Sequence, residues 1–207
     1  MGRPLISVLQ HIAPQLAAVE LRDYANYNSG QPTLHSKLRL LRYDCLRAVC
    51  LSDCCNRLVR SLVKACPMLS RFAAQHSPKM GDDGIVALAE ESKFLSSLEM
   101  SGVSITRDGL CKYLCSESAQ RQLCTLRVTD PKDRLFDDDM LAATLVSAPY
   151  LQEIFLSNTN LSENVSEMVA KISAQELQVV YIAELYSEES LERMRRALPH
   201  AHVWRST

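Results

Sequence analysis

The chain has 207 residues, with 23 lysines and arginines against 24 aspartates and glutamates, 47% apolar residues and 8 cysteines. This apolar content excludes a disordered chain, and the length fits one domain with a sizeable core. The longest uncharged apolar run, residues 140–151, covers about half of the ~20 residues that a membrane span needs, and the sequence shows no secretory signal.

Cysteines and charge give two further expectations. Eight cysteines without a secretory signal predict free thiols in an intracellular, reducing compartment, for which the cytoplasm is favoured over the mitochondrion and the nucleus. The net charge of −1 conceals an asymmetry. Residues 1–80 carry 11 basic and 4 acidic side chains, a balance of +7, whereas residues 81–207 carry 12 basic and 20 acidic side chains, a balance of −8. The chain therefore has a basic half and an acidic half.

The first predicted element is a short helix over residues 4–13, which with its flanks (residues 1–15) would cap the first strand. A repeated pattern then begins: apolar, two variable, apolar, one variable, apolar. Its seven copies start at residues 16, 46, 69, 95, 123, 151 and 177. Self-similarity at such a period is typical of a repeat solenoid, and it accounts for the 30 leucines of the chain.

Each copy predicts a strand followed by a helix. Its last three positions alternate, as in Val49-Cys50-Leu51, which indicates a short strand with one buried face. A polar residue and then apolar residues at helical spacing follow. Such polar side chains accept hydrogen bonds from the free amides of a first helical turn, so the predicted helix caps are Thr106, Asp137, Ser162 and Ser187. Prolines at positions 14, 67 and 149 end the helices and return the chain to an extended form.

Two segments depart from this regularity. The stretch between Tyr24 and Cys45 is weakly patterned, and residues 26–32 are expected to form a loop. Residues 199–207 are expected to form a C-terminal cap with a final strand near Val203. Trp204, the only tryptophan, is predicted to close the open end of the core.

The pattern resembles the leucine-rich repeat family, in particular its cysteine-containing and ribonuclease-inhibitor-like types. Residues 95–110 are similar to the cysteine-containing consensus, and residues 151–161 follow the eleven-residue repeat segment. The resemblance implies one α/β domain over residues 1–207, with repeats over 16–198. About seven strands would form a parallel inner sheet in a right-handed horseshoe, with helices outside. The position that usually holds asparagine or cysteine varies here, being Cys54, Val103, Thr159 and Leu185 in four repeats.

On such a sheet, the middle residue of each strand points to the concave side. These residues are Glu20, Cys50, Ala73, Glu99, Arg127, Phe155 and Tyr181, and a second outward row begins at Arg22. Exposed aromatic side chains beside an arginine have the composition of an interface hot spot. We therefore predict a protein-binding site at Glu99, Arg127, Phe155, Tyr181 and Arg22. The alternative is that cap residues or the C-terminal tail cover these side chains.

No motif indicates catalysis or a cofactor. The sequence holds 6 glycines and no phosphate-binding loop, metalloprotease motif or hydrolase motif. The cluster Cys45, Cys50, Cys54 and Cys55 lacks the paired spacing of a zinc site, so packing of small apolar side chains is favoured. Cys111 and Cys115, four apart on one predicted helix, are also expected to pack in the core, while His200 and His202 are expected to be exposed. Neither a metal nor a cofactor is therefore expected.

A basic stripe lies on one predicted helix. Arg57, Arg60 and Lys64 share one face of it, as a patch that binds nucleic acid or an acidic partner would require. Few aromatic residues interleave this basic patch, so a solvated helix face is favoured over nucleic-acid binding.

These features predict a non-enzymatic protein–protein interaction module. We expect a structural subunit or assembly factor of a larger complex, which binds a protein partner through the concave strand face. The resemblance also implies two alternatives, the substrate-recognition part of a ubiquitin ligase and a regulator of a GTPase. The ligase role normally needs an F-box ahead of the repeats, and the predicted N-terminal helix is too short for one. Nucleic-acid binding through the basic half is the least favoured role.

Overall fold

A computed structural model of the protein describes residues 17–21, 43–129, 131, 135–172, 176–183 and 187–204. Over these residues the chain forms one sheet of eight parallel strands, ordered as they occur in the sequence. The strands are β1 (Ala18–Leu21), β2 (Ala48–Ser52), β3 (Arg71–Gln75), β4 (Ser97–Ser101), β5 (Thr125–Thr129), β6 (Glu153–Leu156), β7 (Val179–Ile182) and β8 (His202–Trp204).

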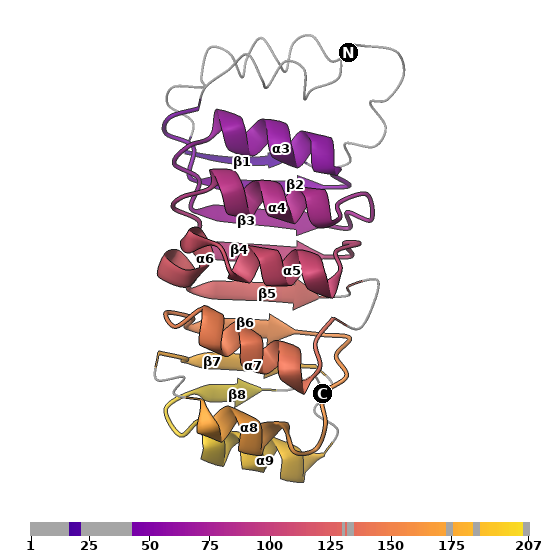
Figure 1. The fold of residues 1–207 in the computed structure, drawn as a ribbon, viewed down its shortest axis with the longest axis vertical. Helices are drawn as coiled ribbons and strands as arrows, with labels where there is room; N and C mark the ends of the chain where they lie inside the picture. Colours follow the sequence, from indigo (N-terminus) through magenta and orange to yellow (C-terminus); the bar gives the residue numbers. More distant parts are fainter. Residues whose placement is uncertain are drawn as a thin grey trace.

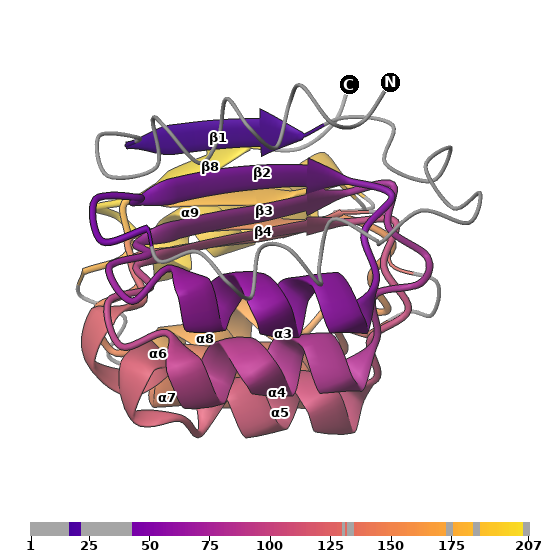
Figure 2. The same cartoon turned by 90° about the horizontal axis from the view of Figure 1, so that it is seen from above.

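Helices connect the strands and lie beside the sheet. They are α3 (Asn56–Ala65), α4 (Asp82–Glu91), α5 (Arg107–Leu114), α6 (Glu117–Gln122), α7 (Asp138–Ser147), α8 (Val165–Lys171) and α9 (Glu188–Ala197). Figure 1 shows the strands stacked in chain order, and Figure 2 shows α3, α4, α5 and α7 in a layer on one side of the sheet. The expected α/β solenoid is confirmed. The helix expected at 4–13, the loop expected at 26–32 and Arg22 lie outside the described residues.

The core consists of the repeated apolar positions. Equivalent residues pair across neighbouring strands, so that Val49 pairs with Phe72, Phe72 with Leu98 and Leu98 with Leu126. All four are at most 2% exposed. Because side chains alternate along a strand, this register turns the intervening residues toward the opposite face. We call that face, which is turned away from α3–α5 and α7, the helix-free face.

A left-handed residue follows the strands at one equivalent position. Asp53, His76, Gly102 and Asn158 have φ angles of 52°, 46°, 60° and 55°. Asparagine, aspartate, histidine and glycine are the residues that enter this region most readily. A Cβ on Gly102 would lie 3.3 Å from the Cα of His76, so the turns of neighbouring repeats also stack closely.

Hydrogen bonds between helix starts link neighbouring repeats. The Asn56 side chain, at the start of α3, accepts the Gly81 N–H at 2.7 Å. The Asp82 carboxylate, at the start of α4, accepts the Thr106 N–H at 2.7 Å and its hydroxyl at 2.6 Å. Thr106 in turn caps α5 by accepting the Gly109 N–H at 3.3 Å, as predicted. A Cβ on Gly109 would lie 2.2 Å from the Asp82 carboxylate, so this link requires glycine there.

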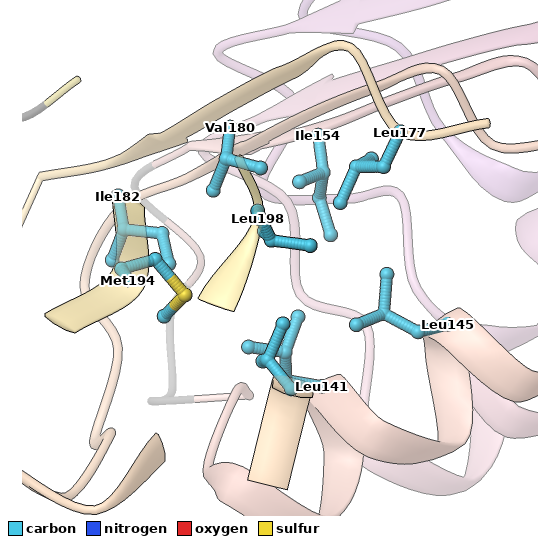
Figure 3. Close-up of a pocket in the computed structure, with 9 residues that line it drawn as sticks. Leu141, Leu145, Ile154, Leu177, Val180, Ile182, Met194 and Leu198 are labelled. Atoms are coloured by element: carbon cyan, nitrogen blue, oxygen red, sulfur yellow. The ribbon is translucent and has the colours of Figure 1, made fainter. Parts of the chain in front are cut away.

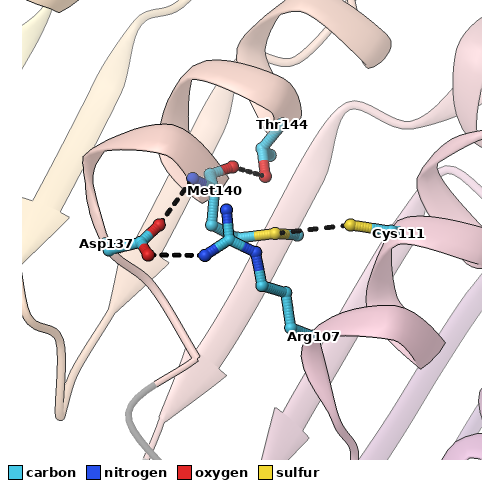
Figure 4. Close-up of polar contacts among 5 residues, drawn as sticks. All are labelled: Arg107, Cys111, Asp137, Met140 and Thr144. Carbon is cyan, nitrogen blue, oxygen red and sulfur yellow. Dashed lines mark hydrogen bonds and ion pairs between the residues drawn. The ribbon is translucent and has the colours of Figure 1, made fainter.

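In the link between α5 and α7 the earlier helix supplies the donor instead of the acceptor (Figure 4). Arg107, the first residue of α5, donates to Asp137 at 2.5 Å, and Asp137 caps α7 by accepting the Met140 N–H at 2.8 Å. This cap was predicted. Burial alone would raise the pKa of Asp137, but the Met140 N–H and the Arg107 guanidinium together hold that pKa below its ordinary value. The Cys111 thiol lies 3.7 Å from the Met140 sulfur, which packs the two helices together.

Of the two remaining predicted caps, one is confirmed and one is wrong. Ser187 caps α9 by accepting the Ser190 N–H at 3.0 Å. Ser162 does not cap α8, which begins at Val165 after a turn at residues 163–164. Its hydroxyl accepts the Asn164 N–H at 3.2 Å and donates to Asp138. Ser162 therefore keeps the link between repeats but not the role of a cap.

Two predicted core residues lie on the surface instead. Trp204 is 57% exposed, and Val203, at 5% exposed, fills the core position at that end. The register explains this outcome, since Val203 pairs with Val180 and Trp204 pairs with the outward Tyr181. Cys115, the C-cap residue of α5, is exposed.

The Asp82–Gly109 contact yields a test. Alanine in place of glycine within a helix ordinarily stabilises by up to about 1 kcal/mol. Gly109→Ala should instead destabilise the protein by about 1–3 kcal/mol in chemical denaturation, because the new methyl group displaces the Asp82 carboxylate from Thr106. In an Asp82→Ala background, most of this cost should vanish. Additive effects of the two substitutions would contradict the account.

The Asp137 pair predicts a dependence on pH. A carboxyl group whose pKa is lowered in the folded state stabilises the protein above its ordinary pKa, near 3.8, and this contribution disappears as the pH falls below that value. Asp137→Asn keeps a capping side chain but loses the charge. It should reduce the free energy of unfolding at pH 7 by at most about 1 kcal/mol and have a smaller effect near pH 2.5, where the carboxylate becomes protonated. Asp139→Asn is the matched control, and an equal loss at both pH values would refute the electrostatic origin.

Candidate functional site

The helix-free face carries a row of large side chains over its last five strands. Register places Glu99 beside Arg127, Arg127 beside Phe155, Phe155 beside Tyr181, and Tyr181 beside Trp204. We call these five residues the aromatic row. Glu99, Arg127, Phe155 and Tyr181 are partly exposed and Trp204 is largely exposed. Neighbouring strands of a sheet lie about 5 Å apart, so the row is continuous.

The row is held by stacking and charge. Phe155 and Tyr181 stack with ring centroids 5.9 Å apart and ring planes inclined by 28°. On Phe155 lies the Arg127 guanidinium, whose central carbon is 3.8 Å from the ring centroid. Glu153, two residues before Phe155 on β6, lies 3.7 Å from the same guanidinium. These contacts restrain the rotamers of Arg127 and Phe155 before any partner arrives, which lowers the entropic cost of binding.

Four of the five predicted binding residues lie in this one line, and Arg22 lies outside the described residues. The expected alternative, that the C-terminal cap covers the aromatic pair, does not apply to residues 199–204, because β8 extends the sheet and leaves Phe155 and Tyr181 partly exposed. Trp204 was missed as a member of the row. The sequence offered a signal for it: Val203 can continue the line of inward apolar residues, and Trp204, the next residue, then points outward.

The face is not uniform along the solenoid. Toward the N-terminal end the middle positions hold Cys50 and Ala73, and Ala73 is 7% exposed. Large side chains in the described part of the row therefore begin at Glu99. Along the middle positions, a partner would meet small side chains on β2 and β3 and large ones from β4 onward.

The basic patch is located on the opposite side of the molecule. Arg57, Arg60 and Lys64 are all exposed on α3, as predicted. The Lys64 ammonium lies 3.5 Å from a Glu91 carboxylate oxygen on α4, so part of the positive charge is balanced locally.

The cysteines of the described ranges do not assemble a metal site. Within those ranges, no three histidine, cysteine, aspartate or glutamate side chains lie together in a way that could hold a metal ion. Cys54 is fully buried, with its sulfur 4.0 Å from that of Met80. Burial raises the pKa of the Cys54 thiol to about 11 and that of Cys66 to about 12, so both stay protonated at neutral pH. His200 and His202 are exposed, as expected.

An interior void offers no ligand site. Side chains of α7, β6, β7 and α9, among them Leu141, Ile154, Val180 and Met194, surround it (Figure 3). It has room for about one water molecule, and its lining is apolar, so it is expected to be dry. In the described part of the chain, no helix is long and apolar enough to cross a membrane.

Comparisons with known proteins identify the fold. No family model matches the chain, and no curated protein does. Among solved structures, a chain of the Rad7 and Elc1 complex from yeast matches with a TM-score of 0.67 at 17% identity, over 99% of this chain and 54% of that one. Two further structures match less closely. The tropomodulin C-terminal domain of Caenorhabditis elegans has a TM-score of 0.38 at 14% identity, over 96% of this chain and 91% of that one. An internalin of Listeria monocytogenes has a TM-score of 0.46 at 13% identity, over 80% of this chain and 48% of that one.

The fold is thus an α/β leucine-rich-repeat solenoid, in agreement with the eight parallel strands and their helical connections. At 17% identity, the match to the Rad7 and Elc1 complex extends to the fold alone. The present chain spans about half of the length of that yeast chain.

Proposed function

We propose that this protein is a non-catalytic protein–protein interaction module that binds one protein partner through the aromatic row. In this proposal it is a structural subunit or assembly factor of a larger complex. The sheet acts as a rigid platform, and recognition centres on Arg127, Phe155 and Tyr181, with Trp204 extending the contact.

The observation that carries the proposal is the partly exposed, pre-stacked arrangement of Arg127, Phe155 and Tyr181. Aromatic and arginine side chains supply most of the binding energy at protein interfaces, and ordered side chains lose little further entropy on binding. A contiguous row of large, partly apolar side chains at the surface is typical of an interaction site. The described residues add no catalytic arrangement that would favour an enzyme.

The structure of similar fold is a complex of two yeast proteins, Rad7 and Elc1, so a chain of this architecture can take part in a protein complex. The alternative roles are distinguished by experiment. Co-purification of ligase components would favour the ubiquitin-ligase role over a constitutive subunit. Stimulated GTP hydrolysis by a small GTPase would favour the GTPase-regulator role. Salt-sensitive RNA or DNA binding that is lost on charge reversal at Arg57, Arg60 and Lys64 would favour nucleic-acid binding.

The test removes the two stacked rings. Phe155→Ala combined with Tyr181→Ala should reduce recovery of the partner by about tenfold or more, since truncation of hot-spot aromatics costs about 2 kcal/mol or more each. Partners are identified by affinity purification from native cells with mass spectrometry, and binding is then measured with the purified pair.

Phe94→Ala is the matched control, because Phe94 is an aromatic residue, 45% exposed, that lies before β4 and outside the row. Thermal unfolding should show that the double variant keeps its fold, with a loss of about 1 kcal/mol from the aromatic pair. Undiminished partner binding by the folded double variant would refute this placement of the site.

A further inference from the structure

Helix α7 differs from every other helix in the described ranges. Each of the others exposes a charged side chain in its second half, such as Lys64 on α3, Lys112 on α5 and Lys171 on α8. In α7 all charges lie in the first turn, and the rest of the helix is uncharged. The outward side of α7 therefore lacks the charged residues that normally keep such a surface solvated.

Apolar side chains occupy this outward side instead. Val146 is 67% exposed, and Ala143, one turn earlier, is also exposed. Residues 143 and 146 lie one turn apart on one face of α7. Tyr150, which is 55% exposed, lies three residues beyond the helix end, in the turn that leads to β6. We call these three residues the α7 stripe.

Acidic side chains border one end of the stripe. Asp139 lies in the first turn of α7, and Glu163 and Glu167 lie at the start of α8. The start of α8 is held beside α7, because the Asp138 carboxylate accepts the Ser162 N–H at 2.8 Å. All three acidic side chains are exposed, and none of them forms an ion pair with another described residue.

We propose that the α7 stripe is a second docking surface, which takes an amphipathic helix bearing basic residues beside its apolar face. Leucine-sized side chains of the ligand would cover Val146 and Tyr150, and its lysines or arginines would meet Asp139, Glu163 and Glu167. A strand cannot add here, because the backbone of α7 is hydrogen-bonded internally.

A second copy of this chain does not supply that ligand from its basic patch. The exposed side chains of α3 are Arg57, Arg60 and Lys64, which offer charge but no apolar surface to cover Val146. The ligand that we assign to the stripe is a helix from another protein, and this second surface is independent of the aromatic row.

The test uses three fluorescein-labelled peptides of about 18 residues, long enough for a helix. One has leucines at positions i, i+3, i+4 and i+7 with lysines elsewhere, one replaces lysine by glutamate, and one scrambles the leucine–lysine order. Anisotropy titrations with the full chain should show the patterned lysine peptide binding about tenfold tighter than the other two. Equal binding of the scrambled peptide would overturn the proposal.

Substitutions locate the site. Val146→Lys should weaken the patterned lysine peptide by about tenfold, while Phe94→Ala should leave its affinity within about twofold. Asp139→Asn with Glu163→Gln should weaken it and flatten its salt dependence. Because Val146 is largely exposed, Val146→Lys should unfold near the parent midpoint, and Tyr150→Ser serves as a second variant outside the helix.

Three results would contradict the assignment. Peptide binding that survives both Val146→Lys and Tyr150→Ser would exclude the stripe. Binding lost in Phe155→Ala with Tyr181→Ala would place the peptide on the aromatic row. A dimer in sedimentation equilibrium that Val146→Lys converts to a monomer would make a second copy the occupant.

Discussion

Pairing of equivalent residues between successive parallel strands determines which side chains enter the core and which reach the helix-free face. Val49, Phe72, Leu98 and Leu126 pair in one line and are buried, and the residue after each of them faces the other way. A shift of one residue in any strand would exchange the two sets. The core and the aromatic row are therefore two consequences of one register.

Much of this register could be predicted, because two separate sequence signals in each repeat indicate it. The spacing of apolar residues gives the alternation of the strand, and the capping residue marks where the helix starts. Thr106, Asp137 and Ser187 were predicted as caps on this basis and accept the expected amide hydrogen bonds. Glu99, Arg127, Phe155 and Tyr181 followed from the same alternation.

The mistaken predictions come from local differences in residue count. Ser162 stands where a cap is expected, but a turn at residues 163–164 delays the helix. Pro199 and Ala201 have the same spacing as Pro149 and Leu151. The inward Ile154 comes three residues after Leu151, so the same count after Ala201 puts Trp204 in the core. The connection from α9 to β8 is one residue shorter than that from α7 to β6, so Val203 takes the inward position. Links such as Asp82 to Thr106 depend on contacts between repeats, which spacing within one repeat does not reveal.

The two surfaces place different demands on the fold. The aromatic row is a property of several repeats in register, whereas the α7 stripe belongs to one helix whose outward side has lost its charges.

The most direct test of the register is the fluorescence of Trp204, the only tryptophan. Emission close to that of the unfolded chain, with strong quenching by acrylamide, is expected for a side chain that is 57% exposed beside Tyr181. Blue-shifted emission protected from acrylamide in the isolated protein would place Trp204 in the core and contradict the register.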